Sequence, residues 1–187
     1  MLDKINLLTL GNQTKNDSMF LIFGEIDTEI AQSTVEWILN ANYTPEDPPE
    51  VLTIFINSVG GDLSAAWAII DVMRGSSIPI RIIGLGQIAS AGLLILSAGE
   101  KGKRILTENT SVMMHQYSWG TVGKHHELLA AAKEYSLMQE RLINHFKKVT
   151  GLTEAEINEK LMPPHDVYMS GEEAKALGIC DEVKTMK

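Results

Sequence analysis

Residues 51–73 read VLTIFINSVGGDLSAAWAIIDVM and hold a complete strand, turn and helix. Val51 to Ile56 are almost all β-branched, aromatic or aliphatic, which predicts a buried strand. The residues that follow, Asn57 to Gly61, form a glycine-rich turn, and apolar residues at helical spacing then predict a helix from Leu63 to Met73. This unit is the building block of a parallel sheet covered by helices.

The same pattern occurs on both sides of this stretch. Before it, a strand expected to be buried runs from Met19 to Gly24, and a helix starts near Asp27 and ends before Pro45. After it, a strand at 79–85 precedes a helix that opens at Ser90. Three such units in series predict an α/β fold with a mainly parallel sheet.

The pattern changes in the second half of the chain. Two short strands are expected at 104–106 and 111–115, followed by a long helix with an apolar stripe that ends at Gly151. Such a stripe is typical of core or of a subunit interface. Capping-box patterns at Thr153 and Ser170 predict two further short helices. No domain boundary is apparent, so we expect a single domain over the whole chain.

Composition limits the class of protein. With 187 residues, 44% hydrophobic and 21% charged, the chain is long enough to bury a sizeable core. A net charge of −8 without a Lys/Arg run argues against a nucleic-acid surface. The single cysteine, Cys180, cannot form an internal disulfide. No segment reaches the ~18 apolar residues of a membrane span, and a cytoplasmic protein is expected.

Ser90 and His115 suggest nucleophilic catalysis. Ser90 stands among small residues, and serine needs a nearby imidazole to take its proton as it attacks. Gly60 and Gly61 follow one predicted strand and Ser90 the next, at the edge where α/β sheets place ligands. The alternative is that these residues have structural roles. Ser90 would then be small because two elements pack closely there, His115 would be a core histidine, and the glycine pair would form a turn that requires positive φ.

A serine site also needs a carboxylate that orients the imidazole, and four aspartates are conceivable. Asp62 is better explained as a helix cap, and Asp71 lies in the middle of a predicted helix. Asp181 remains a candidate for this carboxylate. Asp166 is favoured because it follows Pro163-Pro164-His165, a pinned loop able to direct a side chain inward; the alternative is a loop aspartate in water.

Other chemistries find little support. The order Ser, His, Asp differs from that of the α/β-hydrolase, chymotrypsin and subtilisin classes. His125 and His126 lack the His-Glu-x-x-His spacing, and His145 is expected to be solvated, so no metal site is expected. No phosphate-binding glycine motif occurs, and therefore no bound cofactor is expected.

Four motifs together resemble the proteolytic subunits of Clp proteases, the ClpP family of peptidase family S14. They are Ile56–Gly61, Gly86–Gly92, Met114–Gln116 and Asp166–Ser170, the last with Glu173, Ala174 and Gly178 after it. The motifs occur in the family's order and at close to its spacing, and the similarity runs from about Phe20 to Val183.

The resemblance implies roles for five residues. Ser90 would be the nucleophile, His115 the general base and acid, and Asp166 the orienting carboxylate. Backbone N–H groups of Gly61 and Ala91 would form the oxyanion hole. The resemblance also implies a ClpP/crotonase-like fold and a serine endopeptidase that cuts unfolded proteins or short peptides.

The resemblance further implies assembly. Two stacked heptameric rings would enclose a chamber, and residues 116–150 would form the handle through which the rings meet. Substrate would be threaded by a partner AAA+ unfoldase of the ClpX or ClpA type, which would use the ATP. The segment 1–18 does not match the family's N-terminal segment, and Val59 and Tyr117 stand where proline is common.

Three alternatives remain open at this level. The chain could be a structural ring subunit that assembles with active paralogues. It could be a crotonase-type acyl-CoA hydratase or isomerase, which shares the fold and the oxyanion hole. It could also be a specialised processing protease, for example of a phage particle.

Overall fold

The computed structural model describes residues 4–5, 18–43 and 46–186. The strands are β1 (Lys4–Ile5), β2 (Met19–Ile26), β3 (Leu52–Gly61), β4 (Ile80–Ala89), β5 (Arg104–Thr107), β6 (Ser111–Met114), β7 (Val167–Met169) and β8 (Glu182–Met186). The helices are α2 (Thr28–Tyr43), α3 (Leu63–Gly75), α4 (Ala91–Ser97), α5 (His125–Thr150), α6 (Glu154–Lys160) and α7 (Gly171–Ala176). The chain divides into two compact units, Met1–Met113 with Tyr168–Lys187, and Met114–Val167. The predicted segment 1–18 lies almost entirely outside the described residues.

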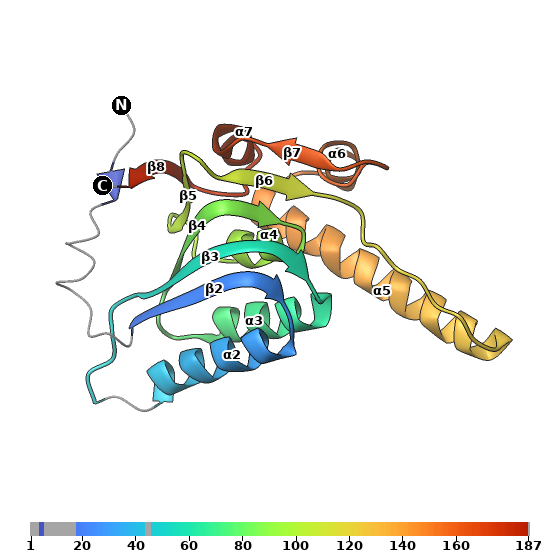
Figure 1. Cartoon of the computed structure of the whole chain (residues 1–187), viewed down its shortest axis with the longest axis horizontal. Coiled ribbons are helices and arrows are strands. Elements are labelled where there is room, and N and C mark those ends of the chain that lie inside the picture. Colours follow the sequence, from blue (N-terminus) through green and yellow to red (C-terminus); the bar gives the residue numbers. More distant parts are fainter. Residues whose placement is uncertain (1–3, 6–17, 44–45, 187) are drawn as a thin grey trace. The chain divides into compact units, whose positions relative to one another are not determined.

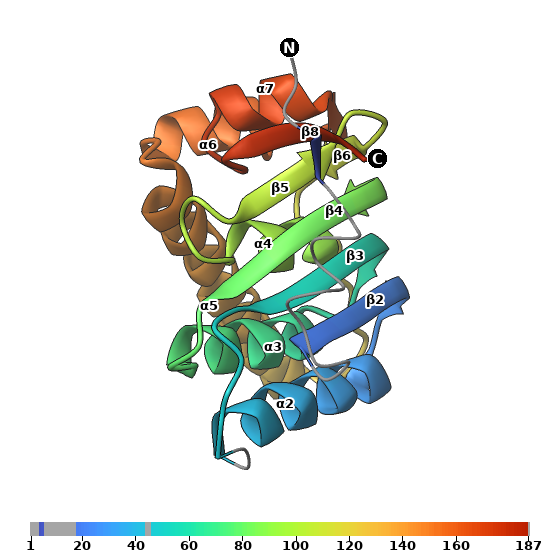
Figure 2. The same ribbon diagram turned by 90° about the vertical axis from the view of Figure 1, so that its left-hand side faces the viewer.

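A parallel sheet organises the first unit. Its strands run in the order β1-β8-β5-β4-β3-β2, and β6 pairs with β4 beside this path. Each of these neighbouring pairs is parallel. Figure 2 shows β2, β3, β4 and β5 side by side, and Figure 1 shows α2, α3 and α4 on one face of them. The predicted α/β fold with a mainly parallel sheet is confirmed.

The middle of the sheet and helix α4 form the centre of the core. In β3 the side chains of Leu52, Ile54 and Ile56 are fully buried, and every residue of α4 is buried. A helix closed in on all sides has little freedom to move, because protein interiors are packed as densely as organic crystals. Helix α4 therefore gives Ser90, the residue directly before it, a rigid support.

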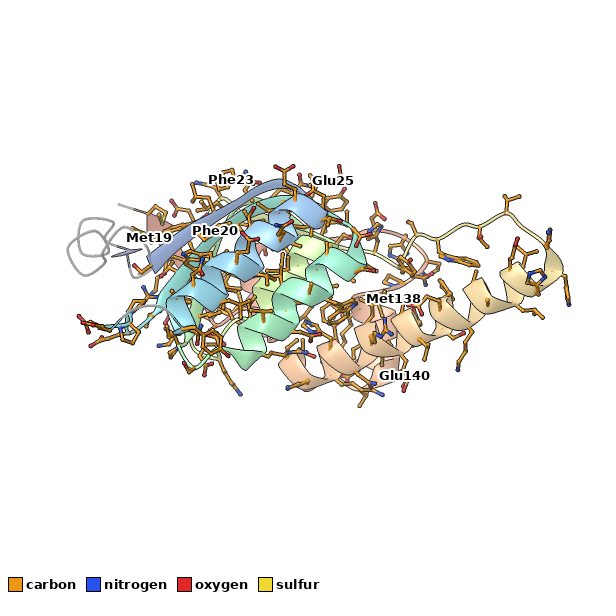
Figure 3. The ribbon with its side chains drawn as sticks, turned by 90° about the horizontal axis from the view of Figure 1, so that it is seen from below. Met19, Phe20, Phe23, Glu25, Met138 and Glu140 are labelled. Carbon is orange, nitrogen blue, oxygen red and sulfur yellow. The ribbon has the colours of Figure 1, made fainter. Side chains whose placement is uncertain are left out.

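The prediction that the first strand is buried was wrong. Strand β2 is the edge of the sheet and continues through Gly24 to Ile26. Figure 3 shows β2 with Phe20 and Phe23 labelled; the Phe20 ring lies 5.2 Å from that of Trp37 in α2, whereas Phe23 is 54% exposed. Neighbouring Leu21 is 63% exposed. An apolar run predicts burial on both faces, but in β2 only the face toward the helices is covered.

Helix α5 dominates the second unit. It begins at His125, where the Lys124 N–H donates to the Glu127 carboxylate at 2.7 Å, and ends at Gly151, which has a φ of 78°. The segment before it runs along the helix (Figure 1), and the ring of Tyr135 contacts those of Tyr117 and Trp119 at centroid distances of 5.8 and 5.4 Å. The predicted long helix is confirmed. None of the helices in the described ranges is long and apolar enough to cross a bilayer.

The expectation that His145 is solvated was wrong, because the residue is buried. It is 3% exposed and meets the ring of Phe146 edge-on, at a centroid distance of 5.4 Å. The reason is its spacing: His145 lies three residues after buried Leu142 and shares the apolar face of α5. Within residues 4–5, 18–43 and 46–186, no group of three His, Cys, Asp or Glu side chains could hold a metal ion.

An ion pair joins β5 to the segment before β8 in the first unit. Asp181 accepts hydrogen bonds from the Arg104 side chain at 2.7 and 3.0 Å and from the Arg104 and Gly102 N–H groups. Burial alone would raise the pKa of Asp181, but the hydrogen bonds and charge of Arg104 outweigh it and lower the pKa. The pair therefore contributes stability above the carboxyl's unfolded pKa of about 3.9 and loses it as the pH falls toward the lower folded value.

We expect Asp181→Asn to lower the free energy of unfolding by about 3 kcal/mol at pH 7, because it leaves the buried Arg104 charge without its partner. The difference from the wild type should shrink as the pH falls below 4. Urea unfolding at several pH values measures it, with Asp71→Asn, an exposed position in α3, as control. A difference that stays constant down to pH 2.5 would contradict the assignment.

Cys180 is the chain's only cysteine and is buried in the first unit. Burial raises the pKa of its thiol to about 12. Since the thiolate is the nucleophile, we expect no reaction with iodoacetamide at pH 8 in the folded protein and complete reaction in denaturant. Intact mass measurement counts the adducts. Rapid alkylation of the folded protein would show that this thiol is accessible.

Candidate active site

Ser90 sits at a sharp turn from strand to helix. It has a φ of 50° and a ψ of −120°, and it is the one residue other than glycine with positive φ among those the structure describes. Its N–H donates to the Met113 carbonyl at 3.0 Å, and its carbonyl accepts from the N–H groups of Leu93 and Leu94. Such a backbone conformation persists only where the surroundings enforce it, and it is concentrated at functional sites.

Gly60 and Gly61, the last two residues of β3, both have positive φ, and this glycine turn packs directly against Ser90 at Gly60. The wider turn predicted over residues 57–61 was wrong, because β3 continues through these residues to Gly61. A Cβ added to Gly60 would lie 2.7 Å from the Cβ of Ser90 and 3.0 Å from the Ala91 nitrogen. Gly60 also has a φ of 98°, a conformation that side chains disfavour. The positive φ expected at this glycine is therefore confirmed, and the absence of a side chain lets the end of β3 approach Ser90.

Ser58 supports this turn and was not singled out from the sequence. Its hydroxyl oxygen accepts the Gly60 N–H at 3.1 Å, and the residue is 1% exposed. A Cβ on Gly92 would lie 3.1 Å from the Ser58 Cβ, so the end of β3 and the start of α4 touch through small residues. The signal in the sequence was a small hydroxyl residue two positions before the glycine.

His115 and Asp166 lie together in the second unit. His115 Nδ1 is 3.8 Å from Asp166 Oδ1, and the two side chains are 30% and 54% exposed. The gap exceeds the 2.7–3.2 Å typical of a hydrogen bond, so the two groups are close without being bonded. His115 directly follows β6 and Asp166 directly precedes β7.

The other candidate aspartates have different tasks. Asp62 caps α3, its carboxylate accepting the Ala65 N–H at 2.7 Å, as predicted. Asp71 is exposed within α3, and Asp181 pairs with Arg104. This leaves Asp166 as the candidate beside His115. Ser90 with its glycine turn belongs to the first unit, and the His–Asp pair belongs to the second.

A second residue missed from the sequence is Gln116. Its side-chain amide donates to the Met162 carbonyl at 3.0 Å, linking the segment that carries His115 to the loop that carries Asp166. The only signal in the sequence that could have identified Gln116 was its position directly after His115. Of the remaining histidines, His126 approaches Glu127 at 3.9 Å on the exposed first turn of α5.

Comparison with protein families gives one result that covers nearly the whole chain. The model of the Clp protease family matches residues 6–187. All of the candidate site residues lie inside that range, and the match agrees with the resemblance drawn from the four sequence motifs. The match also includes residues 6–18, so the expectation that the segment before Met19 does not match the family was wrong for these residues.

Proposed function

The chain belongs to the Clp protease family, and we propose from this that it is a serine endopeptidase subunit with Ser90 as nucleophile. The family is one of serine peptidases that assemble into oligomeric rings. The observation that carries the proposal for this chain is the strained backbone of Ser90, with a φ of 50° at the junction of β4 and the buried helix α4. In nucleophile elbows a strained turn from strand to helix exposes the serine hydroxyl to substrate, and we propose the same task for this turn.

The proposed reaction is acyl transfer. The Ser90 hydroxyl oxygen attacks the peptide carbonyl carbon while His115 takes its proton. The tetrahedral oxyanion is held by the N–H groups of Gly61 and Ala91. On collapse, His115 gives the proton to the leaving amine, and water then attacks the acyl-enzyme with His115 again as base, which releases the acid and restores Ser90.

Two features support this oxyanion hole. The Gly60 N–H is already donated to Ser58, which favours Gly61 as the donor from this turn. Ala91 is the first residue of α4, where backbone N–H groups have no partner within the helix. Because Gly60 packs against the Ser90–Ala91 junction, the two proposed donors belong to segments in contact.

Asp166 is proposed to orient His115 and stabilise its charged form. The 3.8 Å separation suits a resting state, since catalytic hydrogen bonds are often long in free enzymes and shorten when substrate binds. Asp166 is more than half exposed, so its side chain has room for this adjustment.

Exposed apolar residues support self-assembly. Leu21 and Phe23 are uncovered on the edge strand β2, and Val122 and Leu129 are uncovered on or beside the first turns of α5. Exposed apolar clusters and open sheet edges on one chain are typical of interfaces. We propose two stacked heptameric rings, with residues 116–150 as the region of contact between rings.

Substrate delivery by a Clp-type AAA+ unfoldase is part of the proposal. The sequence carries no P-loop motif, so ATP would be used by the partner. The cytoplasmic location stays a prediction from the sequence.

The function is tested by adding a short fluorogenic peptide to the purified protein and measuring its native mass. We expect peptide cleavage by a particle of about fourteen subunits. An assembled particle that cleaves no peptide would favour the structural ring subunit, and turnover of a crotonyl thioester without peptide cleavage would favour the acyl-CoA enzyme. Either result would overturn the proposal.

A further inference from the structure

We propose that Gln116 is a positioning residue that holds His115 and Asp166 within reach of one another. This inference rests on the proposed function, because it assigns a task within the same site. It concerns only the second unit, which contains all the residues involved.

The hydrogen bond from the Gln116 side chain, called the tether below, ends on a residue that is itself held in place. Gln116 donates its side-chain amide to the Met162 carbonyl at 3.0 Å. Met162 is 1% exposed, and its own N–H donates to the Ile157 carbonyl in α6 at 2.9 Å. The acceptor of the tether is therefore part of a packed residue that is itself hydrogen-bonded to a helix.

The chain between the tether and the carboxylate is stiff. Met162 is followed by Pro163, Pro164 and His165 before Asp166 is reached. Proline fixes φ near −65° and also restricts the residue before it, so two prolines in succession leave little freedom. The two prolines therefore couple the position of Asp166 to that of the Met162 carbonyl. Because Gln116 is hydrogen-bonded to this carbonyl, the bond also sets where His115 lies relative to Asp166.

A second contact holds the same segment one residue further along the chain. The ring of Tyr117 stacks on that of Tyr135 in α5, with a centroid distance of 5.8 Å and an angle of 16° between the planes. Together the two contacts fix the segment directly after His115 to both helices of the unit.

The direct contact between His115 and Asp166 is too weak to do this alone. At 3.8 Å it is an ion pair only when the imidazole is protonated, and both groups are partly exposed. In catalysis His115 alternates between neutral and charged forms. The amide of Gln116 does not titrate, so its bond to Met162 persists through both states and keeps the pair in place.

The test compares two replacements at position 116. Gln116→Met keeps an unbranched side chain but removes the donor, and we expect the rate constant for fluorophosphonate labelling of the active serine to fall about tenfold. Gln116→Lys restores a donor of similar reach and should stay within about threefold of the wild type. The control is Gln139→Met, in the same unit, whose side-chain oxygen has no hydrogen-bond partner among the described residues; it should label at the wild-type rate.

A double-mutant cycle separates positioning from a general structural effect. If Gln116 acts through Asp166, Gln116→Met should lower the rate less than twofold in an Asp166→Asn background. An equal tenfold loss in both backgrounds, or no loss in either, would overturn the inference. Equal loss in the Met and Lys variants would also overturn it.

The experiment distinguishes failure of this inference from failure of the proposed function. If the wild type is not labelled at all, the serine peptidase assignment fails and the inference fails with it. If the wild type is labelled and the Gln116 variants match it, the function stands and the tether is wrong. Native mass and thermal unfolding of each variant show that assembly and folding are preserved in the comparison.

Discussion

Ser90→Ala is expected to lower kcat/KM for peptide cleavage by about four to six orders of magnitude, because the acyl-enzyme cannot form without the hydroxyl oxygen. The change removes one atom from a half-buried residue. Alanine adopts the φ of 50° with the same strain as serine, so the free energy of unfolding should stay nearly constant. Initial rates with a fluorogenic peptide, together with urea unfolding, measure both quantities.

The matched control is Ser33→Ala. Ser33 is an exposed serine of the same unit, on α2, whose hydroxyl donates to the Glu29 carbonyl. It should leave the cleavage rate unchanged. Residual activity of Ser90→Ala above about one part in a thousand would show that another group attacks the substrate.

Gly60→Ala is expected to lower kcat/KM by at least about a hundredfold, comparable to the loss of an oxyanion donor. The added methyl group would lie 2.7 Å from the Ser90 Cβ and 3.0 Å from the Ala89 carbonyl oxygen, so the turn and the nucleophile must separate. The positive φ of 98° adds backbone strain of about 1 to 2 kcal/mol. The peptide assay and urea unfolding report the two effects separately.

Gly24 offers a closely matched control for the strain. Its φ is 96°, and a Cβ there would have nothing within 4 Å. Gly24→Ala should therefore lose similar stability and keep its activity. If Gly60→Ala keeps its activity as well, the turn does not position the oxyanion donor; if both variants lose activity alike, general destabilisation is responsible.

Much of the fold could be predicted because local patterns and global architecture agree. The strand and the helix predicted within residues 51–73 are confirmed, although β3 extends to Gly61 through the residues predicted as a turn, and Asp62 caps the helix as its position suggests. The alternation of strands and helices then left a parallel sheet as the natural solution. The capping boxes at Thr153 and Ser170 are also confirmed.

The failures concern burial, which depends on neighbours. The run at Met19 to Gly24 is apolar enough for a central strand, yet β2 is the sheet edge, because strand order is set by tertiary contacts. His145 looked solvated because it is polar, whereas its place three residues after Leu142 puts it on the buried face of α5. Helical spacing, and not the polarity of the side chain, decides the burial of this residue.

The residues of the candidate site were also predicted only in part. Reactive residue types at the ends of strands marked Ser90, His115 and Asp166, and their roles remain proposals. Ser58 and Gln116 were not predicted because each acts through a hydrogen bond to a backbone group, and neither is a reactive residue of the kind that marks a catalytic site. Tyr117, a departure from the family's usual proline, finds a physical reason in its stacking on Tyr135.

The central claim is that Ser90 is an activated nucleophile. The most direct measurement is fluorophosphonate labelling of the assembled wild-type protein, followed by intact mass and peptide mapping. Ser90 oxygen should displace fluoride from phosphorus, giving one adduct per chain at Ser90, formed far more slowly in His115→Ala. Peptide cleavage that continues while Ser90 carries no adduct, or an adduct on a different serine, would contradict the account.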